Sequence, residues 1–452
     1  MSTTHDLMQD LQRGKIGRRE FIARAVALGV SLSGIEAILQ SCGGGGGAPG
    51  ATSVTWSTWG NPGELDRFQK FTTDFNTKHS NINVQLIPIP SSSDYSAKIL
   101  TELTSGTAPD VFYSGDQDVA RFIKNKTVIE LTSLLSGSNS QSKPDDFYPG
   151  LFGAAKTTDG KIYGVPVDCN PLILWVNKSV LQAAGVTTMP NDLYAQGQWN
   201  RAAFQSMIQQ VHSKGQYGYI LDDWTLVWYS WVGANGGTVY DNNGNGKFVA
   251  NQDPKTVETF KWLSDNVQAK TIIFAGTLPK GQGTDLSFMA KQAAFVAAGR
   301  WYLPEFKQVG SSLQYDVVPF PTNTGKKIEP AIVAEAYMVM NAASKHQSQA
   351  FEFLTNFVSP AGQTFRLSGG GNAVPSVKGP DQVVLQGNDP AHAQVFLDAR
   401  NIGVAAPPSE SRTSGLAADI QTATDAIFFK GADVQATLNK VATMVNSRIT
   451  TG

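Results

Sequence analysis

The stretch Val54-Thr55-Trp56-Ser57-Thr58-Trp59-Gly60-Asn61-Pro62-Gly63-Glu64 decides the fold class of this chain. Its first half alternates apolar and polar residues, which is the period of a β-strand. Asn61 and Pro62 then supply a helix cap and a first-turn proline. The residues that follow repeat with helical spacing at Leu65, Phe68, Phe71 and Phe75. A strand that feeds a helix is the unit from which parallel α/β sheets are built.

The same alternation recurs along the chain. Residues 82–89 are predicted as a strand, 94–105 as a helix and 110–113 as a short buried strand. Further helices are predicted at 200–214, 255–269, 347–358 and 433–447, and further strands near 293–297, 315–319 and 331–340. With 452 residues, of which 41% are hydrophobic, the chain can bury two ordinary cores. We therefore expect an α/β protein of two lobes.

The segment 1–42 has the pattern of an export signal. Arg18 and Arg19 precede an apolar run at 25–35, and Cys42 follows with five glycines behind it. This order indicates a secretory signal peptide of the twin-arginine type, with lipoprotein processing at Cys42. The apolar run is about half of the roughly 20 residues that span a bilayer, which argues against a transmembrane helix. A buried amphipathic helix would not need the glycine-rich tether at 43–52. We expect an exported lipoprotein, anchored at the outer face of the cytoplasmic membrane.

Composition narrows the partners. Lys and Arg number 36 and Asp and Glu number 37, so there is no basic excess for a phosphate backbone or an anionic membrane surface. We expect no nucleic-acid partner, no membrane contact apart from the anchor, and a monomer. Once Cys42 carries lipid, Cys169 is the one remaining cysteine, so no disulfide framework is expected.

Signatures of catalysis and cofactor binding are missing from the sequence. It has no phosphate-binding loop ending in Gly-Lys-Ser/Thr, no nucleophile elbow and no His-Glu-x-x-His. The five histidines lie far apart in the sequence, so neither a local metal site nor a cofactor is expected. The turn at 241–246 resembles the front of a calcium loop. Gln252 stands where the bidentate glutamate belongs, which favours an ordinary Asn/Gly turn over a calcium site.

Aromatic side chains stand beside polar ones in the predicted loops of this chain, which has nine tryptophans. One tryptophan by itself is as often core as site, but several near turn glycines and carboxylates suggest a binding platform. The residues with this setting are Trp56, Trp59, Tyr113, Trp224, Trp228, Tyr229, Trp231, Trp301 and Tyr302. Sugars suit such a platform, because their C–H faces stack on rings while their hydroxyls bond to Asp, Glu, Asn and Arg.

A series of motifs in a specific order covers nearly the whole exported part. They are Leu103-Thr104-Ser105-Gly106-Thr107-Ala108-Pro109-Asp110-Val111-Phe112, Val128-Ile129-Glu130-Leu131-Thr132, Asp159-Gly160-Lys161-Ile162-Tyr163-Gly164-Val165-Pro166, Trp175-Val176-Asn177-Lys178, Ala234-Asn235-Gly236-Gly237, Ala298-Gly299-Arg300-Trp301 and Ala343-Ser344-Lys345-His346. In their order and spacing the chain resembles the family 1 extracellular solute-binding proteins, which are the carbohydrate receptors of ABC importers.

This resemblance implies a periplasmic-binding-protein fold of type II, with two discontinuous α/β lobes and the ligand in the cleft between them. It places the hinge crossings near 165–170, 317–321 and 368–373. Lobe 1 is then expected at 53–166 and 318–368, and lobe 2 at 167–317 and 369–452. The permease subunits of an ABC importer are the implied protein partners.

The family's ligand contacts fall on loops at the edge of the cleft, and the resemblance carries them to matching positions here. The contacts implied for the first lobe and the first crossing are Trp59, Asn61, Asp116, Asp168 and Asn170. The contacts implied for the rest of the cleft are Trp228 or Trp231, Arg300, Trp301, Gly370 and Asn372. Glu335 stands where the family more often has a small residue, so it is either a ligand acceptor or an internal ion-pair partner.

Three classes of function fit the sequence. A receptor that delivers a sugar or oligosaccharide to an importer explains the anchor, the lobes and the aromatic residues, and Arg300 keeps open a receptor for glycerol phosphates. An exported glycoside hydrolase would need two carboxylates about 5 to 10 Å apart, for which Asp116, Asp168 and Glu335 are the candidates. A cell-wall scaffold protein is the third class. The sequence predicts the receptor, not an enzyme, and leaves the sugar unidentified.

Overall fold

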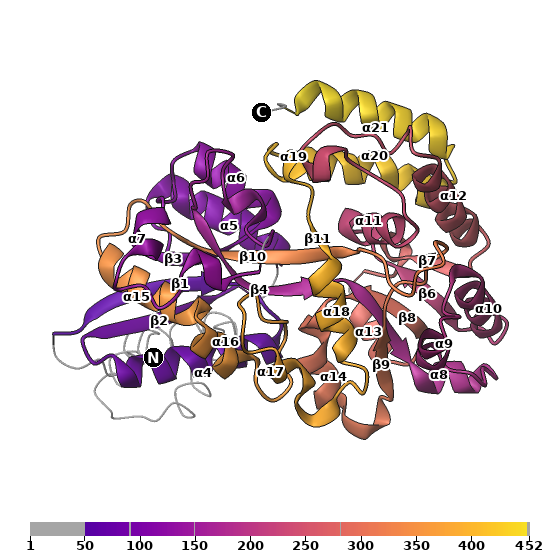
Figure 1. Cartoon of the computed structure of the whole chain (residues 1–452), viewed down its shortest axis with the longest axis horizontal. Helices are drawn as coiled ribbons and strands as arrows, with labels where there is room; N and C mark the ends of the chain where they lie inside the picture. The colour runs from indigo at the N-terminus through magenta and orange to yellow at the C-terminus, as the bar shows by residue number, and fades with distance from the viewer. Residues whose placement is uncertain (1–49, 90–91, 149, 281, 450–452) are drawn as a thin grey trace, which may run out of the picture.

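The computed structural model describes residues 50–449 apart from 90–91, 149 and 281. The signal segment, Cys42 and most of the predicted tether lie outside these residues. The described chain forms two α/β halves side by side, each built on its own sheet, and strands β4 and β10 lie where the halves meet (Figure 1). No helix in this part of the chain is both long and apolar enough to cross a membrane.

The first half is built on a mixed sheet of strand order β11-β10-β3-β1-β2, with β4 paired to β10. β1 runs parallel to β2 and β3, whereas β10 runs antiparallel to β3 and β4. The strands are β1 (Thr52–Thr58), β2 (Ile82–Pro88), β3 (Val111–Gly115), β4 (Gly164–Pro171), β10 (Ile332–Met340) and β11 (Val404–Ala405). The helices around it are α4 (Pro62–Lys78), α5 (Ser92–Ser105), α6 (Asp116–Lys124), α7 (Thr132–Ser136), α15 (Gln347–Val358) and α16 (Pro360–Leu367).

The second half is built on a sheet of strand order β7-β6-β8-β5-β9. Its strands are β5 (Ile173–Asn177), β6 (Tyr217–Leu221), β7 (Ile272–Phe274), β8 (Ala293–Ala298) and β9 (Tyr315–Val318). Its helices are α8 (Lys178–Ala183), α9 (Pro190–Ala195), α10 (Arg201–His212), α11 (Thr225–Ala234), α12 (Pro254–Gln268), α13 (Thr284–Met289), α14 (Leu303–Val309), α17 (Gln382–Leu385), α18 (Gln394–Ile402), α19 (Pro408–Ser411), α20 (Leu416–Lys430) and α21 (Val434–Arg448).

The predicted junction between the first strand and the first helix is confirmed. Asn61 Oδ1 accepts the backbone N–H of Glu64, and Glu64 Oε2 accepts the backbone N–H of Asn61, each at 2.9 Å. This reciprocal cap satisfies two amide groups that the start of a helix would otherwise leave without a partner. It also holds both side chains at the carboxyl end of β1.

Each half has its own apolar core. In the first half, the fully buried Trp56 packs against Phe68, Phe353 and Phe357. Burying a large apolar side chain contributes about 2–3 kcal/mol to stability. The second half has two clusters, one on each face of its sheet, and the second of these also includes Cys169 of β4. Separate cores let the halves keep their internal packing if they move relative to each other.

The chain passes between the two sheets at short segments. Leu172 alone separates β4 of the first sheet from β5 of the second, and the segment between Val318 and Ile332 leads back from β9 to β10. β4 and β11 extend the first sheet beyond the ranges 53–166 and 318–368 that the sequence predicts for lobe 1. The lobe boundaries predicted from the sequence remain a prediction, since parts of β4 and all of β11 belong to the first sheet but fall in the range predicted for lobe 2.

The turn at 241–246 is closed by its own side chain. Asp241 Oδ1 accepts the backbone N–H of Lys247 at 2.5 Å, and the backbone at Gly246 passes against the same carboxylate. In the described chain, no group of three or more His, Cys, Asp and Glu side chains is arranged to hold a metal ion. An ordinary turn remains our interpretation of this segment.

Glu410 makes stability depend on pH. It is buried and accepts hydrogen bonds from Tyr229 and Tyr240 at 2.9 and 3.0 Å, and burial raises its pKa from 4.5 to about 7. A raised pKa means that the folded state favours the neutral carboxyl, so this stability is present below pH 4.5 and is lost as the pH rises through about 7. We expect Glu410→Gln, which stays neutral, to gain up to about 3 kcal/mol over the wild type across that window.

Urea unfolding of both proteins at several pH values measures this difference. Glu130→Gln, at an exposed position just before α7, is the control and should follow the wild type. A difference between Glu410→Gln and the wild type that is the same at every pH would contradict the buried-carboxyl account.

Candidate functional site

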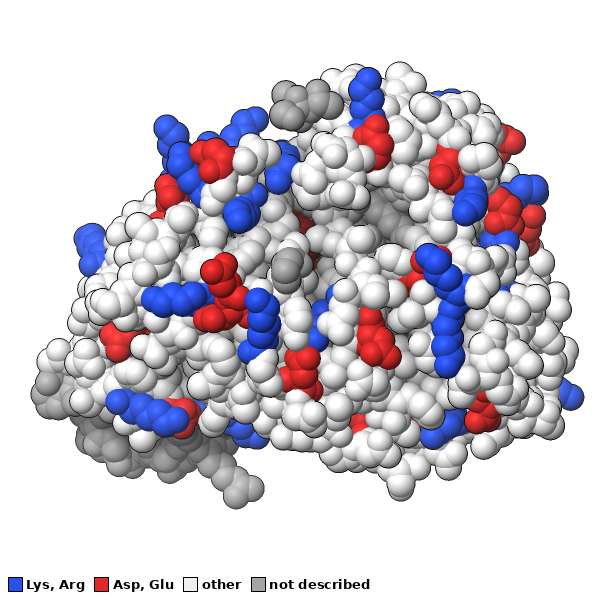
Figure 2. Space-filling model, viewed as in Figure 1, with Lys and Arg blue, Asp and Glu red and all other residues white. Residues whose placement is uncertain are grey.

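The predicted binding loops follow strands of both sheets. Trp59 and Asn61 follow β1, Asp116 follows β3, and Trp301 follows β8. Figure 2 shows a hollow in the surface between the two halves, with acidic side chains visible inside it. Open α/β sheets bind ligands at the carboxyl ends of their strands. We call the space bounded by these strand ends and by β4 and β10 the interlobe cleft.

Trp301 is the meeting point of four chain segments. Its backbone oxygen accepts a hydrogen bond from Asn61 Nδ2 of the first half at 3.0 Å. Asn170 Oδ1 of β4 accepts the backbone N–H of the preceding residue, Arg300, at 2.8 Å. The indole of Trp301 lies 6.3 Å from that of Trp224, between ring centroids, and both rings are half-buried. The structure thus brings together Asn61, Asn170 and Trp301, three of the residues that the sequence predicts as ligand contacts.

Trp59 presents a second half-buried ring, on the first half. It packs edge-on against Tyr95 and Tyr113, with ring centroids 5.1 and 5.4 Å apart. The hydroxyl of Tyr113 is buried and has no hydrogen-bond partner among the described residues. This loop therefore offers an aromatic face next to an unused hydroxyl.

Asp116 and Glu335 form a buried acidic pair. Asp116 begins α6, and its carboxylate accepts the hydroxyl of Tyr337 at 2.7 Å and the backbone N–H of Glu335 at 3.4 Å. Burial raises the pKa of Asp116 to about 6. Neither carboxylate oxygen of Glu335 has a partner in the described chain, and burial, reinforced by Asp116 and Asp168, raises the pKa of Glu335 well above its usual value. The sequence left open whether Glu335 pairs internally, and no ion pair of Glu335 occurs among the described residues.

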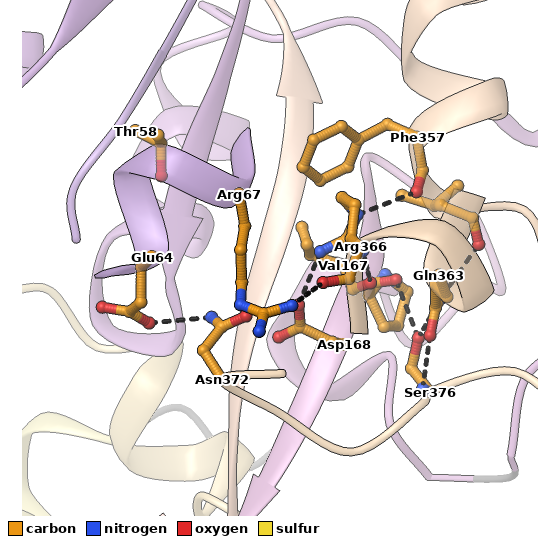
Figure 3. Close-up of polar contacts among 12 residues, drawn as sticks. Thr58, Glu64, Arg67, Val167, Asp168, Phe357, Gln363, Arg366, Asn372 and Ser376 are labelled. Atoms are coloured by element: carbon orange, nitrogen blue, oxygen red, sulfur yellow. Dashed lines mark hydrogen bonds and ion pairs between the residues drawn. The ribbon is translucent and has the colours of Figure 1, made fainter. Parts of the chain in front are cut away.

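Asp168 is occupied by an internal ion pair (Figure 3). Arg366 of α16 donates to Asp168 Oδ2 at 3.0 Å and to the Val167 carbonyl at 2.9 Å, and its guanidinium lies 4.0 Å from the ring centroid of Phe357. Burial raises the pKa of Asp168, and Arg366 opposes that shift. The expectation that Asp168 accepts ligand hydroxyls is not supported by this geometry, because the guanidinium of Arg366 already donates to its carboxylate.

The segment after α16 is tied to helix α4. Arg67 donates to the carbonyls of Ser368 and Gly370 at 2.8 and 2.9 Å. Asn372 Nδ2 donates to Glu64 Oε1 at 2.8 Å, so the two side chains point toward each other in Figure 3. Gly370 has φ +87°, a conformation that favours glycine. The role visible for Gly370 is therefore to let the backbone take this conformation and to offer its carbonyl to Arg67. The buried Oδ1 of Asn372 has no partner among the described residues.

Comparison with known proteins assigns this geometry to a family. Residues 60–364 match the bacterial extracellular solute-binding proteins. The chain belongs to this family. Its members bind solutes rather than convert them.

Two relatives and one solved structure are similar to this solute-binding protein. The maltodextrin-binding protein MdxE of Bacillus subtilis is 27% identical over 229 residues, 48% of this chain and 49% of that protein. A lipoprotein of Streptomyces antibioticus is 21% identical over 305 residues, 66% of this chain and 65% of that one. The chain thus aligns with about half to two thirds of these relatives. The ABC substrate-binding protein Lmo0181 of Listeria monocytogenes, solved with cycloalternan, has a TM-score of 0.76 at 19% identity, over 88% of this chain and 98% of that chain. The predicted two-sheet fold of periplasmic binding proteins is thereby confirmed.

Two predicted contacts of this solute-binding protein are core residues instead. Trp228 and Trp231 have no exposed surface: Trp228 packs against Phe428 at 4.9 Å, and Trp231 donates to the hydroxyl of Tyr219 at 3.0 Å. The expectation for these residues is wrong in this structure, because α11 is apolar on nearly all sides and is buried throughout most of its length.

Arg300 is also turned away from the cleft. It has no exposed surface, donates to the Val384 carbonyl of α17 at 3.1 Å, and lies over the ring of Phe396 in α18. Burial lowers the pKa of Arg300 to about 10. Arg300 and Trp301 are neighbours in one short turn, in which Arg300 is fully buried and the Trp301 side chain is half-buried.

Asp222 was missed by the sequence reasoning. It follows β6, and burial together with the adjacent Asp223 raises its pKa to about 7. Thr284 Oγ1 lies 3.4 Å from Asp222 Oδ2 and 2.7 Å from the hydroxyl of Tyr302. The signal that could have found it is its position, since a carboxylate directly after a strand and before Trp224 obeys the same strand-end rule as Asp116.

We expect Asp168→Asn to act first on stability. It leaves the buried cation of Arg366 without its counter-charge, which typically costs about 3–5 kcal/mol. Denaturant unfolding measures the loss, and the double variant Asp168→Asn with Arg366→Met should recover much of it. Asp66→Asn, which breaks the exposed pair with Lys70, is the control and should cost less than about 1 kcal/mol. A stable Asp168→Asn protein with weakened ligand binding would restore Asp168 as a ligand contact.

Proposed function

We propose that this protein is the extracellular receptor that binds a sugar or oligosaccharide and presents it to the permease subunits of an ABC importer. The observation that carries the proposal is the cluster at Trp301. There a half-buried aromatic pair, Trp224 and Trp301, adjoins amide side chains from the other half of the molecule. The binding names of MdxE and the cycloalternan in the Lmo0181 structure support an oligosaccharide as the ligand class.

The chemistry of the cleft suits sugars. Indole faces can stack on the C–H faces of a pyranose, while carboxylates accept its hydroxyls. A hydrogen bond to a charged group contributes about 1.5–3 kcal/mol. Asp222, directly after β6 and two residues before Trp224, provides such an acceptor. A ligand held from both sides favours the closed arrangement by its differential affinity for that state.

Two alternatives lose support from particular residues. A glycerol-phosphate ligand would need an available cation: Arg366 is paired with Asp168 and Arg67 donates to backbone carbonyls, whereas Arg300 is buried against α17 and α18 with Nε and Nη1 unpartnered among the described residues. A glycoside hydrolase would need a free pair of carboxylates, but Asp168 is engaged by Arg366 and Asp116 by Tyr337. A scaffold protein would not need half-buried aromatic side chains between its two halves, so this alternative does not explain the Trp224–Trp301 pair. The receptor accounts for all of these contacts.

We also propose that Cys42 anchors the receptor to the outer face of the cytoplasmic membrane, after export through the twin-arginine route. The proposal rests on the order of Arg18-Arg19, the apolar run, Cys42 and the glycine tether. The similar Streptomyces antibioticus protein is itself described as a lipoprotein. An anchored receptor stays close to its permease, which raises the local concentration of one for the other.

Trp301→Ala should weaken sugar binding about thirtyfold, because the loss of a central aromatic contact costs about 2 kcal/mol or more. Titration calorimetry with maltodextrins and other glucose oligosaccharides measures the change. Phe429→Ala removes an exposed ring of α20 outside the cleft and serves as the control. If both variants bind like the wild type, the Trp301 cluster is not the binding site.

Cys42→Ser should release the protein from membranes into the soluble fraction, since thioether lipidation needs the thiol. Fractionation and mass spectrometry of the mature amino terminus provide the measurement. Replacing Arg18 and Arg19 by lysine should block export while leaving the purified domain able to bind. Wild-type protein that is soluble and retains Met1 would rule out the anchor but not the receptor.

A further inference from the structure

Gly63 is the position at which helix α4 of the first half meets helix α14 of the second half. It is buried at the second position of α4, and a Cβ atom there would lie 2.7 Å from Cβ of Pro304 in α14. Carbon atoms that are not bonded to each other pack at about 3.5–4.0 Å. The starts of the two helices are therefore so close that a side chain at Gly63 would push them apart.

The backbone at this position does not itself require glycine. Gly63 lies within the regular first turn of α4 and does not have the positive φ angle that favours glycine. Alanine favours a helix more than glycine does, so the glycine is locally the less favourable choice. The close approach of Pro304 is what explains the absence of a side chain at Gly63.

A second glycine permits the same close approach beside it. Gly299 follows β8, and a Cβ atom there would lie 2.6 Å from Cβ of Asn170 on β4 and would also collide with the ring of Trp301. Asn61 Nδ2 of the first half donates to the Trp301 carbonyl across the same boundary. The turn that carries Trp301 is thus held against the first half by contacts with both α4 and β4.

The halves also touch at α19, but that contact is of a different kind. α19 packs against α6 of the first half, and Arg412 just after it donates to Asn245 Oδ1 at 3.0 Å and to the Lys156 carbonyl of the first half at 3.5 Å. A long arginine side chain can follow a small movement by changing its rotamer. Gly63 and Pro304 meet through backbone and a rigid ring, so their contact cannot adjust in this way.

We infer that Gly63 is a positioning residue, whose missing side chain sets how closely the two halves approach each other at α4 and α14. Trp59 stands four residues before Gly63, and Trp301 stands three residues before Pro304. The contact thereby fixes the separation between aromatic residues from the two halves for which we propose ligand contact. This inference deepens the proposed function and rests on it. A solute that contacts both halves binds best at one separation, because its affinity follows the population of the arrangement that fits it.

A distance between the halves tests the inference without any ligand. In the full chain with Cys42→Ser, the remaining native cysteine, Cys169, is buried, so spin labels attach at Lys70→Cys on α4 and Ser312→Cys after α14. We expect Gly63→Ala to lengthen the mean distance between the labels by about 1 Å, which is the shortfall from van der Waals contact. Gly63→Val should lengthen it further.

Affinity for maltodextrins measures the consequence for binding. Gly63→Ala should bind about tenfold more weakly, because the added methyl group overpacks the contact that brings the halves together. The midpoint of urea unfolding should not fall, since the halves can move apart to relieve the strain and alanine favours α4. Ser348→Ala, at the exposed second position of α15, is the control and should change neither the label distance nor the affinity.

Pro304→Gly provides the rescue, because it removes the opposing Cβ atom from α14. Combined with Gly63→Ala, it should restore the label distance and most of the affinity. An unchanged distance in both Gly63→Ala and Gly63→Val would overturn the inference, as would a loss of affinity that Pro304→Gly does not recover. If Gly63→Val does not fold, Gly63→Ala with and without Pro304→Gly decides. If the wild type binds no maltodextrin or other sugar, the proposed function fails by itself, and the label distances still decide whether Gly63 sets the approach of the halves.

Discussion

The buried ion pair between Asp168 and Arg366 is the contact on which the junction of the two halves depends. Arg366 belongs to α16, and Asp168 lies on β4 three residues before that strand ends and the chain enters the second sheet. A guanidinium with no exposed surface cannot be satisfied by water, so it needs acceptors from the protein. Asp168, the Val167 carbonyl and the ring of Phe357 supply them. They hold β4 in place beside β10, where Asn170 of β4 contacts the Arg300–Trp301 turn.

A chain of side-chain contacts extends this junction to the start of α4. Gln363 donates to Ser376 Oγ at 2.8 Å, and Ser376 donates to the Pro166 carbonyl of β4 at 3.0 Å. Asn372 then reaches Glu64, whose other oxygen caps α4 together with Asn61. Asn61 in turn contacts Trp301 of the other half. The β4–β5 crossing and the segment after α16 are thus linked to Asn61 and Trp301, for which we propose ligand contact, and a movement of the halves has to act on these contacts.

The cleft is electrostatically unfavourable by itself. Burial raises the pKa values of Glu64, Asp116, Asp222 and Glu335, so ionisation of each opposes folding. Groups with perturbed pKa values cluster at functional sites. A carboxylate that is kept open for a solute has no permanent cation beside it, so burial shifts its pKa. Burial raises the pKa of Asp168 as well, but among these carboxylates Asp168 is the one with an ion-pair partner, Arg366, in the described chain.

The sequence by itself determined the α/β class, the β1–α4 junction with its Asn61 cap, and the strand-end positions of Asp116 and Trp301. These features depend on periodicity and on contacts within a few residues, which a linear pattern records. Only the tertiary structure decided that Asp168 pairs with Arg366, 198 positions away, that Trp228 and Trp231 are core, and that Arg300 turns from the cleft. Each of these outcomes depends on which elements pack together in space, and burial of a tryptophan or pairing of a carboxylate leaves no mark on its sequence neighbours.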